Sequence, residues 1–234
     1  MSRKTYAGGF APVGPSHRAA EVTPVVQAMD MTQPLSGCRI IPGFLDAQSQ
    51  AALLRALDAV LAAAPLYIPR MPKSGKPLTV RMSNCGPLGW VSDQAGYRYQ
   101  PLHPETNQAW PPFPPLLLNA WQALADYPHP PESCLINYYG PGAKMGLHQD
   151  RDERNFNAPV VSLSLGDTAL FRIGGRQRAD RTCTVRLASG DAVVLGGDAR
   201  LAFHGVDRIV PGTSTLLPQG GRFNLTLRRV TCPA

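Results

Sequence analysis

The sequence predicts an α+β protein in which helices pack on one face of a β-jelly-roll. From residue 159 onward, short β-forming runs are separated by glycine-containing turns, a pattern typical of sandwiches, barrels and jelly rolls. Helical periodicity is confined to the first half of the chain, which places the helices together on one side of the strands. The runs expected to form strands are 160–165, 169–173, 183–187, 192–195, 202–204 and 222–228.

Length and composition predict one structured domain. The chain has 234 residues, of which 44% are hydrophobic and 17% charged, the balance of a globular protein with a sizeable core. Residues 1–35 contain several prolines, a glycine pair and little periodicity, so we expect a flexible or extended arm there. Residues 36–234 are expected to form a single domain.

Two helices are expected before the main run of strands. A short strand at residues 40–41 precedes Asp46, which offers an N-cap for a helix over 47–63. Leucines recur at helical spacing in that helix, and Pro65 ends it. A second helix over 116–127 leads into the β-forming run that begins at Cys134.

Aromatic residues, proline and glycine are frequent in residues 66–115. The run Gly86–Trp90 indicates a loop, and residues 96–99 indicate a strand with Tyr97 and Tyr99 on one face. Aromatic rings beside basic residues are one way in which proteins hold unstacked bases. The same rings also fill the edges of cores, and on their own they favour that interpretation.

The charge balance indicates a polyanionic partner. The net charge is +7 and the sequence pI is about 9.4, which favours nucleic acid, although many basic proteins bind none. The basic residues are scattered, so a shaped surface is expected rather than a charged tail. Five cysteines without a CxxC pair, no leader and no long apolar run predict a reduced cytoplasmic protein that does not enter a membrane.

Candidate metal ligands lie in the segment CLINYYGPGAKMGLHQDRDE, residues 134–153. After its Gly-Pro-Gly turn, His148 and Asp150 stand one residue apart, so in an extended chain both side chains point to one side. With His204, the one histidine that follows, they match the two-His-one-carboxylate set that holds non-heme Fe(II) with open positions. The His-x-Asp pair alone is weak evidence, because cupin-like proteins and some zinc sites also contain it.

The run over residues 222–228 alternates polar and apolar side chains. One face is apolar and is expected to pack in the core, while the other carries Arg222, Asn224 and Arg228. An inward-facing arginine is costly unless an anion pairs with it, and two guanidinium groups suit the two ends of a dicarboxylate. A surface strand with alternating charges is the alternative, and the nearby metal ligands favour the ligand-binding interpretation.

Several motifs, taken together and in this order, resemble the AlkB family of Fe(II)- and 2-oxoglutarate-dependent dioxygenases, in particular its bacterial alkylation-repair members. They span residues 38–229 and read NCGPLGW, GYRYQP, LINYYGPGAKMGLHQDRDE, FRIGG, SGDAVVLGGDARLAFHGV and RFNLTLR. The resemblance implies a double-stranded β-helix, which is a jelly-roll, over about 133–230. It also implies a nucleotide-recognition lid over about 66–115.

The resemblance also assigns roles to individual residues. It implies Fe(II) ligation by His148, Asp150 and His204. The residues implied to bind 2-oxoglutarate are Asn137, Tyr139, Arg222, Asn224 and Arg228. For the substrate, it implies stacking of Trp90 on the damaged base, Asp152 against the exocyclic edge of that base, and further contacts from Tyr97, Tyr99 and Arg178.

The activity implied is oxidative demethylation of N-alkylated bases, such as 1-methyladenine and 3-methylcytosine, with O2 as co-substrate and release of formaldehyde and succinate. This is direct-reversal repair of DNA, single-stranded DNA being favoured, with duplex DNA and RNA as further candidates, by a monomeric enzyme. Three alternative functions are an oxygenase of proteins or small molecules, a zinc hydrolase, and a non-catalytic jelly-roll module. The aromatic residues speak against the first, the two arginines against the second and the complete ligand set against the third.

Overall fold

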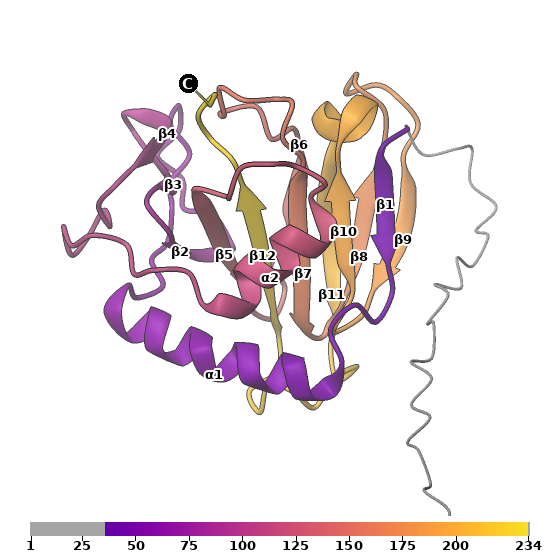
Figure 1. The fold of residues 1–234 in the computed structure, drawn as a ribbon, viewed down its shortest axis with the longest axis horizontal. Helices are drawn as coiled ribbons and strands as arrows, with labels where there is room; N and C mark the ends of the chain where they lie inside the picture. Colours follow the sequence, from indigo (N-terminus) through magenta and orange to yellow (C-terminus); the bar gives the residue numbers. More distant parts are fainter. Residues whose placement is uncertain (1–35, 234) are drawn as a thin grey trace, which may run out of the picture.

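The computed structural model describes residues 36–233, so the arm expected over residues 1–35 lies outside the described residues. Most of its regular structure is β, as Figure 1 shows. In chain order the strands are β1 (Cys38–Ile41), β2 (Arg81–Cys85), β3 (Gly89–Asp93), β4 (Gly96–Gln100), β5 (Ser133–Tyr139), β6 (Met145–His148), β7 (Val160–Gly166), β8 (Thr168–Ile173), β9 (Cys183–Leu187), β10 (Ala192–Leu195), β11 (His204–Val210) and β12 (Arg222–Arg228). The helices are α1 (Ala47–Ala63), α2 (Pro115–Leu124) and the short 3-10 helix η1 (Gly197–Leu201).

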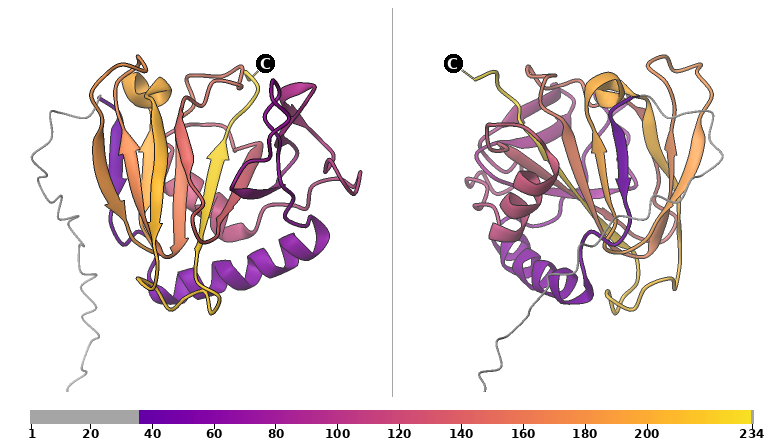
Figure 2. Two further views of the ribbon diagram at one scale, coloured as in Figure 1. Left: turned by 180° about the vertical axis from the view of Figure 1, so that it is seen from behind. Right: turned by 45° about the vertical axis from the view of Figure 1, so that its right-hand side comes forward.

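Two antiparallel sheets face each other and form the jelly-roll core that the sequence predicts (Figures 1 and 2). The larger sheet has the order β1-β10-β7-β12-β5-β2, and the smaller one has the order β6-β11-β8-β9. Apolar side chains from both sheets meet between them, including Leu135 and Val193 from the larger and Phe171 and Val185 from the smaller. The double-stranded β-helix is therefore confirmed.

Both α-helices cover the outer face of the larger sheet, where they lie to one side of the strands (Figure 2, right). Asp46 caps α1 as predicted, because its Oδ1 accepts a hydrogen bond from the Ser49 amide at 2.7 Å. The second helix ends at Leu124, three residues before the predicted end. Asp126 there adopts a left-handed φ of 47°, which a continuing helix cannot contain.

Strand β12 shows how the sequence alternation is used. Phe223, Leu225 and Leu227 pack against the helix-side core, so the alternate residues, Arg222 and Arg228 among them, point into the space between the sheets. The predicted bounds of this strand are those observed. The larger sheet thus presents an apolar outer face and a partly polar inner face.

The prediction of a strand over 202–204 was wrong. Residues 197–201 form η1, and the strand begins only at His204, where pairing with both β6 and β8 starts. Three strands, β2, β3 and β6, were not predicted, and Trp90, expected in a loop, belongs to β3. These strands are short, and their residues do not carry the apolar alternation that marks a strand.

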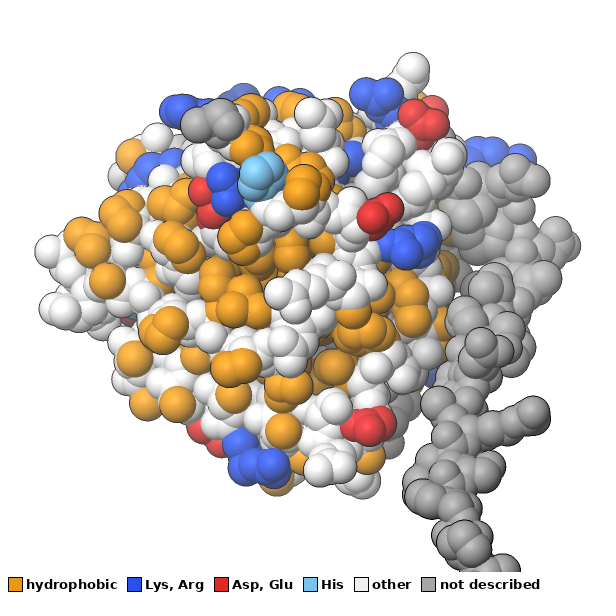
Figure 3. Space-filling model, viewed as in Figure 1, with side chains coloured by type: hydrophobic (Ala, Val, Ile, Leu, Met, Phe, Trp, Pro, Cys, Tyr) orange, Lys and Arg blue, Asp and Glu red, His pale blue; other side chains and the backbone are white. Residues whose placement is uncertain are grey.

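Residues 66–110 lie beside one edge of the jelly-roll. Strand β2 extends the larger sheet, while β3 and β4 form a separate two-stranded sheet (Figure 1). On the face that carries α1 and α2, hydrophobic and uncharged side chains predominate and charged ones are scattered (Figure 3). Neither described α-helix has the length and apolar character needed to cross a membrane.

Candidate active site

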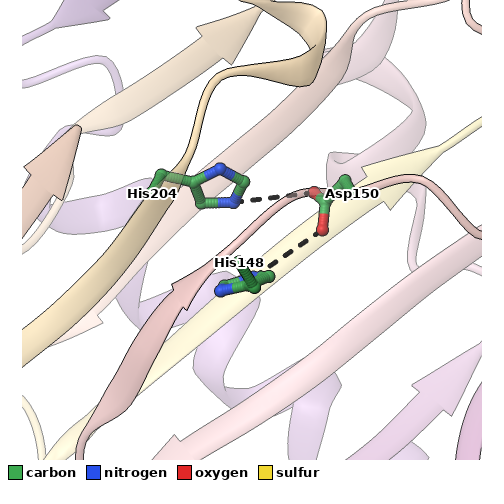
Figure 4. A group of neighbouring side chains, drawn as sticks. All are labelled: His148, Asp150 and His204. Atoms are coloured by element: carbon green, nitrogen blue, oxygen red, sulfur yellow. Dashed lines mark ion pairs between the residues drawn. The ribbon is translucent and has the colours of Figure 1, made fainter. Parts of the chain in front are cut away.

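The predicted metal ligands converge at one end of the smaller sheet. His148 ends β6, His204 begins β11, and the two residues are direct partners in the antiparallel ladder. Asp150 follows β6 by two residues and lies to one side of both imidazoles, with its carboxylate directed toward them (Figure 4). Its Oδ1 lies 3.8 Å from His148 Nε2 and its Oδ2 lies 3.8 Å from His204 Nε2. One divalent cation can therefore contact all three side chains.

Backbone carbonyls orient both imidazoles toward that point. His148 Nδ1 lies 2.9 Å from the carbonyl oxygen of Gly146, and His204 Nδ1 lies 2.9 Å from that of Ala202. A carbonyl oxygen only accepts hydrogen bonds, so each Nδ1 carries a proton, and in the neutral form of each ring the lone pair lies on Nε2. Both rings are thus held in the form that binds a metal.

The electrostatics of the site also favour cation binding. Burial lowers the pKa of His204 to about 4, and the neighbouring His148 adds to this effect, so the ring is neutral at pH 7. Burial by itself would raise the pKa of the Asp150 carboxyl. Arg228 and the two imidazoles outweigh it and hold that pKa well below its usual range. The ligand set therefore includes an anionic carboxylate at Asp150 and a neutral imidazole donor at His204.

The two arginines of β12 differ in their partners. Arg228 pairs with the protein's own carboxylates, its Nη2 lying 2.9 Å from Asp150 Oδ2 and its Nε 3.4 Å from Glu153 Oε1. Arg222 is 1% exposed and has no carboxylate partner among the described residues. Arg222 is therefore without a counter-ion among the described residues, and its role in binding an external anion stays a prediction, whereas Asp150 and Glu153 already balance the charge of Arg228.

Neutral groups hold Arg222 and leave some N–H groups of its guanidinium without a partner. Its Nη1 donates to the carbonyl oxygens of Asp167 and Leu187 at 3.2 and 3.1 Å, and its Nη2 donates to Ser164 Oγ at 2.5 Å. A guanidinium has five N–H groups, so one at Nε and one at Nη2 remain. Burial lowers the pKa of Arg222 to about 10, which leaves it charged at neutral pH.

A cavity of about 640 Å³ connects these groups. Every residue for which the sequence predicts a metal, cosubstrate or substrate role lines it, including Asn137, Tyr139 and Asn224. Among the described residues, three buried polar atoms in this lining have no hydrogen-bond partner: Arg222 Nε, Arg228 Nη1 and Asn137 Oδ1. Unpaired buried polar atoms are uncommon in proteins, and here they fit a small polar ligand bound in the cavity.

Strands β3 and β4, in the segment predicted to form a lid, contact two consecutive carboxylates that line the cavity. Trp90 Nε1 donates a hydrogen bond to Asp152 Oδ2 at 2.8 Å, and the Tyr99 hydroxyl donates one to Glu153 Oε1. Trp90 also stacks on Tyr97, with ring centroids 5.5 Å apart. The structure thus pairs Trp90 with Asp152, two residues that were both predicted to contact the substrate base.

The basic residues near the aromatic rings and the cavity differ in the partners that they already have. Arg178 lines the cavity and its guanidinium lies 4.9 Å from the centre of the Phe203 ring. Arg98, which the sequence places beside the lid tyrosines, forms a two-point pair with Asp93 at 2.9 and 2.8 Å. Arg81 lies over the Tyr138 ring at 4.7 Å. Of these three, Arg178 alone faces the cavity.

Two residues of the site were not predicted, Glu153 and Arg200. Both are buried, at 5% and 2% exposure, and they form an ion pair of 3.0 Å next to Asp150. The sequence could have indicated Glu153, because it ends the segment that contains the metal ligands. It could not have indicated Arg200, because nothing in the neighbouring residues marks that arginine as buried.

Comparison with known proteins agrees with this geometry. The sequence model of the 2OG-Fe(II) oxygenase superfamily matches residues 37–228. The chain belongs to this superfamily and, within it, to the AlkB dioxygenases. It is 56% identical over 193 residues to an alpha-ketoglutarate-dependent dioxygenase AlkB homolog of Caulobacter vibrioides, covering 82% of this chain and 87% of that protein. It is 41% identical over 181 residues to AlkB of Escherichia coli, covering 76% and 83%.

Solved and more distant relatives extend the match. The structure of OsALKBH1 superimposes with a TM-score of 0.71 at 31% identity, covering 85% of this chain and 98% of that one. A tRNA demethylase, abh1 of Schizosaccharomyces pombe, is 32% identical over 145 residues, covering 59% and 48%. The protein is therefore an Fe(II)- and 2-oxoglutarate-dependent dioxygenase, and its cofactors are Fe(II), 2-oxoglutarate and O2. The unpaired polar atoms of the cavity fit these groups.

Proposed function

We propose that this dioxygenase demethylates N-alkylated bases of nucleic acid, with 1-methyladenine and 3-methylcytosine in single-stranded DNA as its preferred substrates. The observation that carries the proposal is the aromatic pair Trp90 and Tyr97, which lines the same cavity as the His-Asp-His site. Stacked rings at the mouth of a deep cavity suit a base taken out of its helix, and a methylated Watson–Crick edge makes that removal less costly.

Within this proposal the two arginines hold the cosubstrate. Arg228 lies beside Asp150, so its free Nη1 suits the carboxylate next to the metal, and Arg222 suits the distal carboxylate. The two residues stand six positions apart on β12, about 20 Å between their Cα atoms, and both side chains point into the cavity. Asn137, Tyr139 and Asn224 are further candidates for hydrogen bonds to the same molecule.

When bound, Fe(II), 2-oxoglutarate and O2 supply the oxidant that hydroxylates the N-methyl group, which then leaves as formaldehyde. The protein's residues position the reactants. Trp90 and Tyr97 orient the base by stacking, while Tyr99 and Arg178 contact the nucleic-acid strand on either side of that base. Asp152 exchanges its bond to Trp90 for a contact with the base, and its carboxylate favours the positive charge of a methylated ring.

The proposal extends to the form of the substrate and of the enzyme. A single strand is preferred because its base reaches the cavity without opening a duplex. We also propose that the enzyme is a monomer, because the three metal ligands, both arginines of β12 and the aromatic pair converge within a single chain. We place the enzyme in the cytoplasm, which agrees with five cysteines that form no disulfide among the described residues.

Substitution of Asp152 by Asn tests the assignment of the base pocket. The variant keeps the shape of the side chain and loses its charge, so demethylation of cationic 1-methyladenine should fall by roughly 10- to 100-fold, about 1.4–2.8 kcal/mol. Turnover of a neutral adduct, such as 1-methylguanine, should change far less. Rates are measured by mass spectrometry on otherwise identical oligonucleotides. Equal losses on both adducts would remove Asp152 from base selection.

A further inference from the structure

Glu153 is a buried carboxylate between the lid and the metal ligand Asp150. Its Oε1 accepts a hydrogen bond from the Tyr99 hydroxyl and lies 3.4 Å from Arg228 Nε. Its Oε2 accepts a hydrogen bond of 3.0 Å from Arg200 Nη2. These three partners belong to β4, β12 and η1, so one side chain connects the lid, the larger sheet and the turn that precedes β11.

Both arginines that contact Glu153 also hold Asp150. Arg200 Nη1 donates to the main-chain carbonyl oxygen of Asp150 at 2.6 Å, while its Nε donates to that of Ala158 at 2.9 Å. Arg228 binds the carboxylate of Asp150, with Nη2 and Nε at 2.9 and 3.2 Å from Oδ2. Arg200 therefore fixes the backbone of the metal ligand, and Arg228 fixes its side chain.

Charge balance explains why a second carboxylate is needed. Arg200 and Arg228 are almost completely buried, and Asp150 and Glu153 are the carboxylates that pair with them among the described residues. A buried charge without a partner is costly. Without Glu153, Asp150 would be the carboxylate left to balance Arg228, which already contacts its Oδ2, the oxygen nearest His204 Nε2. Arg228 would then compete more strongly with the cation for that oxygen.

We propose that Glu153 is a positioning residue for metal binding: it holds Arg200 and Arg228, and through them keeps Asp150 oriented for the cation. Tyr99 binds the same carboxylate and thereby anchors the lid to this network. The inference rests on the proposed role of His148, Asp150 and His204 as cation ligands, and it does not depend on the identity of the substrate.

The test measures the affinity of the full-length protein for Mn(II), a cation that binds without starting the reaction. Unbound Mn(II) is quantified by electron paramagnetic resonance for the wild type and for Glu153→Gln, which keeps the shape but removes the charge. Changes to the partners of metal ligands typically weaken metal affinity by about 10- to 100-fold, and a loss in this range is expected. Glu153→Asp, which keeps the charge, should recover part of it.

Glu132→Gln is the matched control. Glu132 also pairs with an arginine, Arg229 at 3.5 Å, and it accepts backbone hydrogen bonds from Val230 and Thr231 at 2.9 and 2.7 Å. It pairs with neither Arg200 nor Arg228. Its substitution should lower the melting temperature while Mn(II) affinity stays within about twofold of the wild type, as expected for a carboxylate that is not coupled to the site.

Two further variants separate the possible outcomes. Tyr99→Phe removes the lid contact but leaves both arginine contacts, so its Mn(II) affinity should stay within about twofold of the wild type. A loss equal to that of Glu153→Gln would show that the effect runs through the lid, and would overturn the proposed route. Asp150→Ala should abolish binding, and if it does not, the ligand assignment itself fails. The role of Glu153 would be overturned if the folded Glu153→Gln and Glu153→Asp proteins both bound Mn(II) with the affinity of the wild type.

Discussion

Replacing Arg222 by Lys should weaken 2-oxoglutarate binding while preserving the positive charge. The guanidinium has two N–H groups left after its bonds to Asp167, Leu187 and Ser164. A lysine ammonium has three donors in total, and the same three acceptors would occupy all of them. The variant should therefore keep its local structure and lose its bonds to the distal carboxylate.

The expected size of the effect follows from the number of bonds lost. A hydrogen bond to a charged group contributes about 1.5–3 kcal/mol. Two such bonds are lost, and the retained positive charge offsets part of that loss, so we expect a net effect of about one bond, which weakens binding by roughly 10- to 150-fold. Calorimetric titration of the Mn(II)-loaded protein with 2-oxoglutarate measures this directly. Mn(II) affinity without cosubstrate should stay unchanged, because Arg228 and not Arg222 contacts Asp150.

A second ligand makes this test specific. 2-Oxopentanoate keeps the α-keto acid but lacks the distal carboxylate, so the wild type should bind it more weakly than 2-oxoglutarate by a similar factor. Arg222→Lys should bind both ligands with nearly equal affinity. If the variant retained the wild-type preference for 2-oxoglutarate, the assignment of Arg222 to the distal carboxylate would be wrong.

Two other predictions concern the metal site. A Cβ at Gly205 would lie 2.6 Å from the Met145 carbonyl oxygen, so Gly205→Ala should force β11 from β6 and destabilise the protein by about 1–3 kcal/mol, with weakened Mn(II) binding. Gly146→Ala is the control, since a Cβ there meets no atom within 4 Å, and equal melting temperatures for the two variants would contradict the reasoning. The pKa of buried His204 falls from 6.5 to about 4 on folding, so the unfolded chain binds more protons between these values and stability declines as pH falls through this range. The full effect is about 3 kcal/mol, and urea unfolding of the metal-free protein at pH 7 and pH 4.5 should show a smaller decline for His204→Asn than for the wild type.

The parts of the site that could be predicted are those with a local pattern. The alternation in β12 specifies which side chains share a face, because a strand has a period of two. The spacing of His148 and Asp150 is a local pattern as well, although β6 ends at His148 and Asp150 lies just beyond it. The Asp46 cap and the proline after α1 have the same local character. Each of these features depends on neighbours within a few residues, so the sequence alone contains it.

The parts that could not be predicted depend on long-range pairing. The ion pair between Glu153 and Arg200 joins residues 47 positions apart, and the bond between Trp90 and Asp152 joins residues 62 apart. The sequence shows that these groups are charged or polar but does not show which of them meet. Arg228 illustrates the consequence, since its alternation places it inside correctly while its carboxylate partners become visible only in the fold.

Mass spectrometry of a short single-stranded oligonucleotide that carries one 1-methyladenine tests the central claim most directly. The protein is incubated with Fe(II), 2-oxoglutarate and ascorbate under air, and each component is omitted in turn. We expect the oligonucleotide to lose the mass of one methylene group only when both Fe(II) and 2-oxoglutarate are present, with formaldehyde and succinate formed in equal amounts. An unchanged oligonucleotide with continued succinate formation would leave the protein an oxygenase and contradict demethylation of this base.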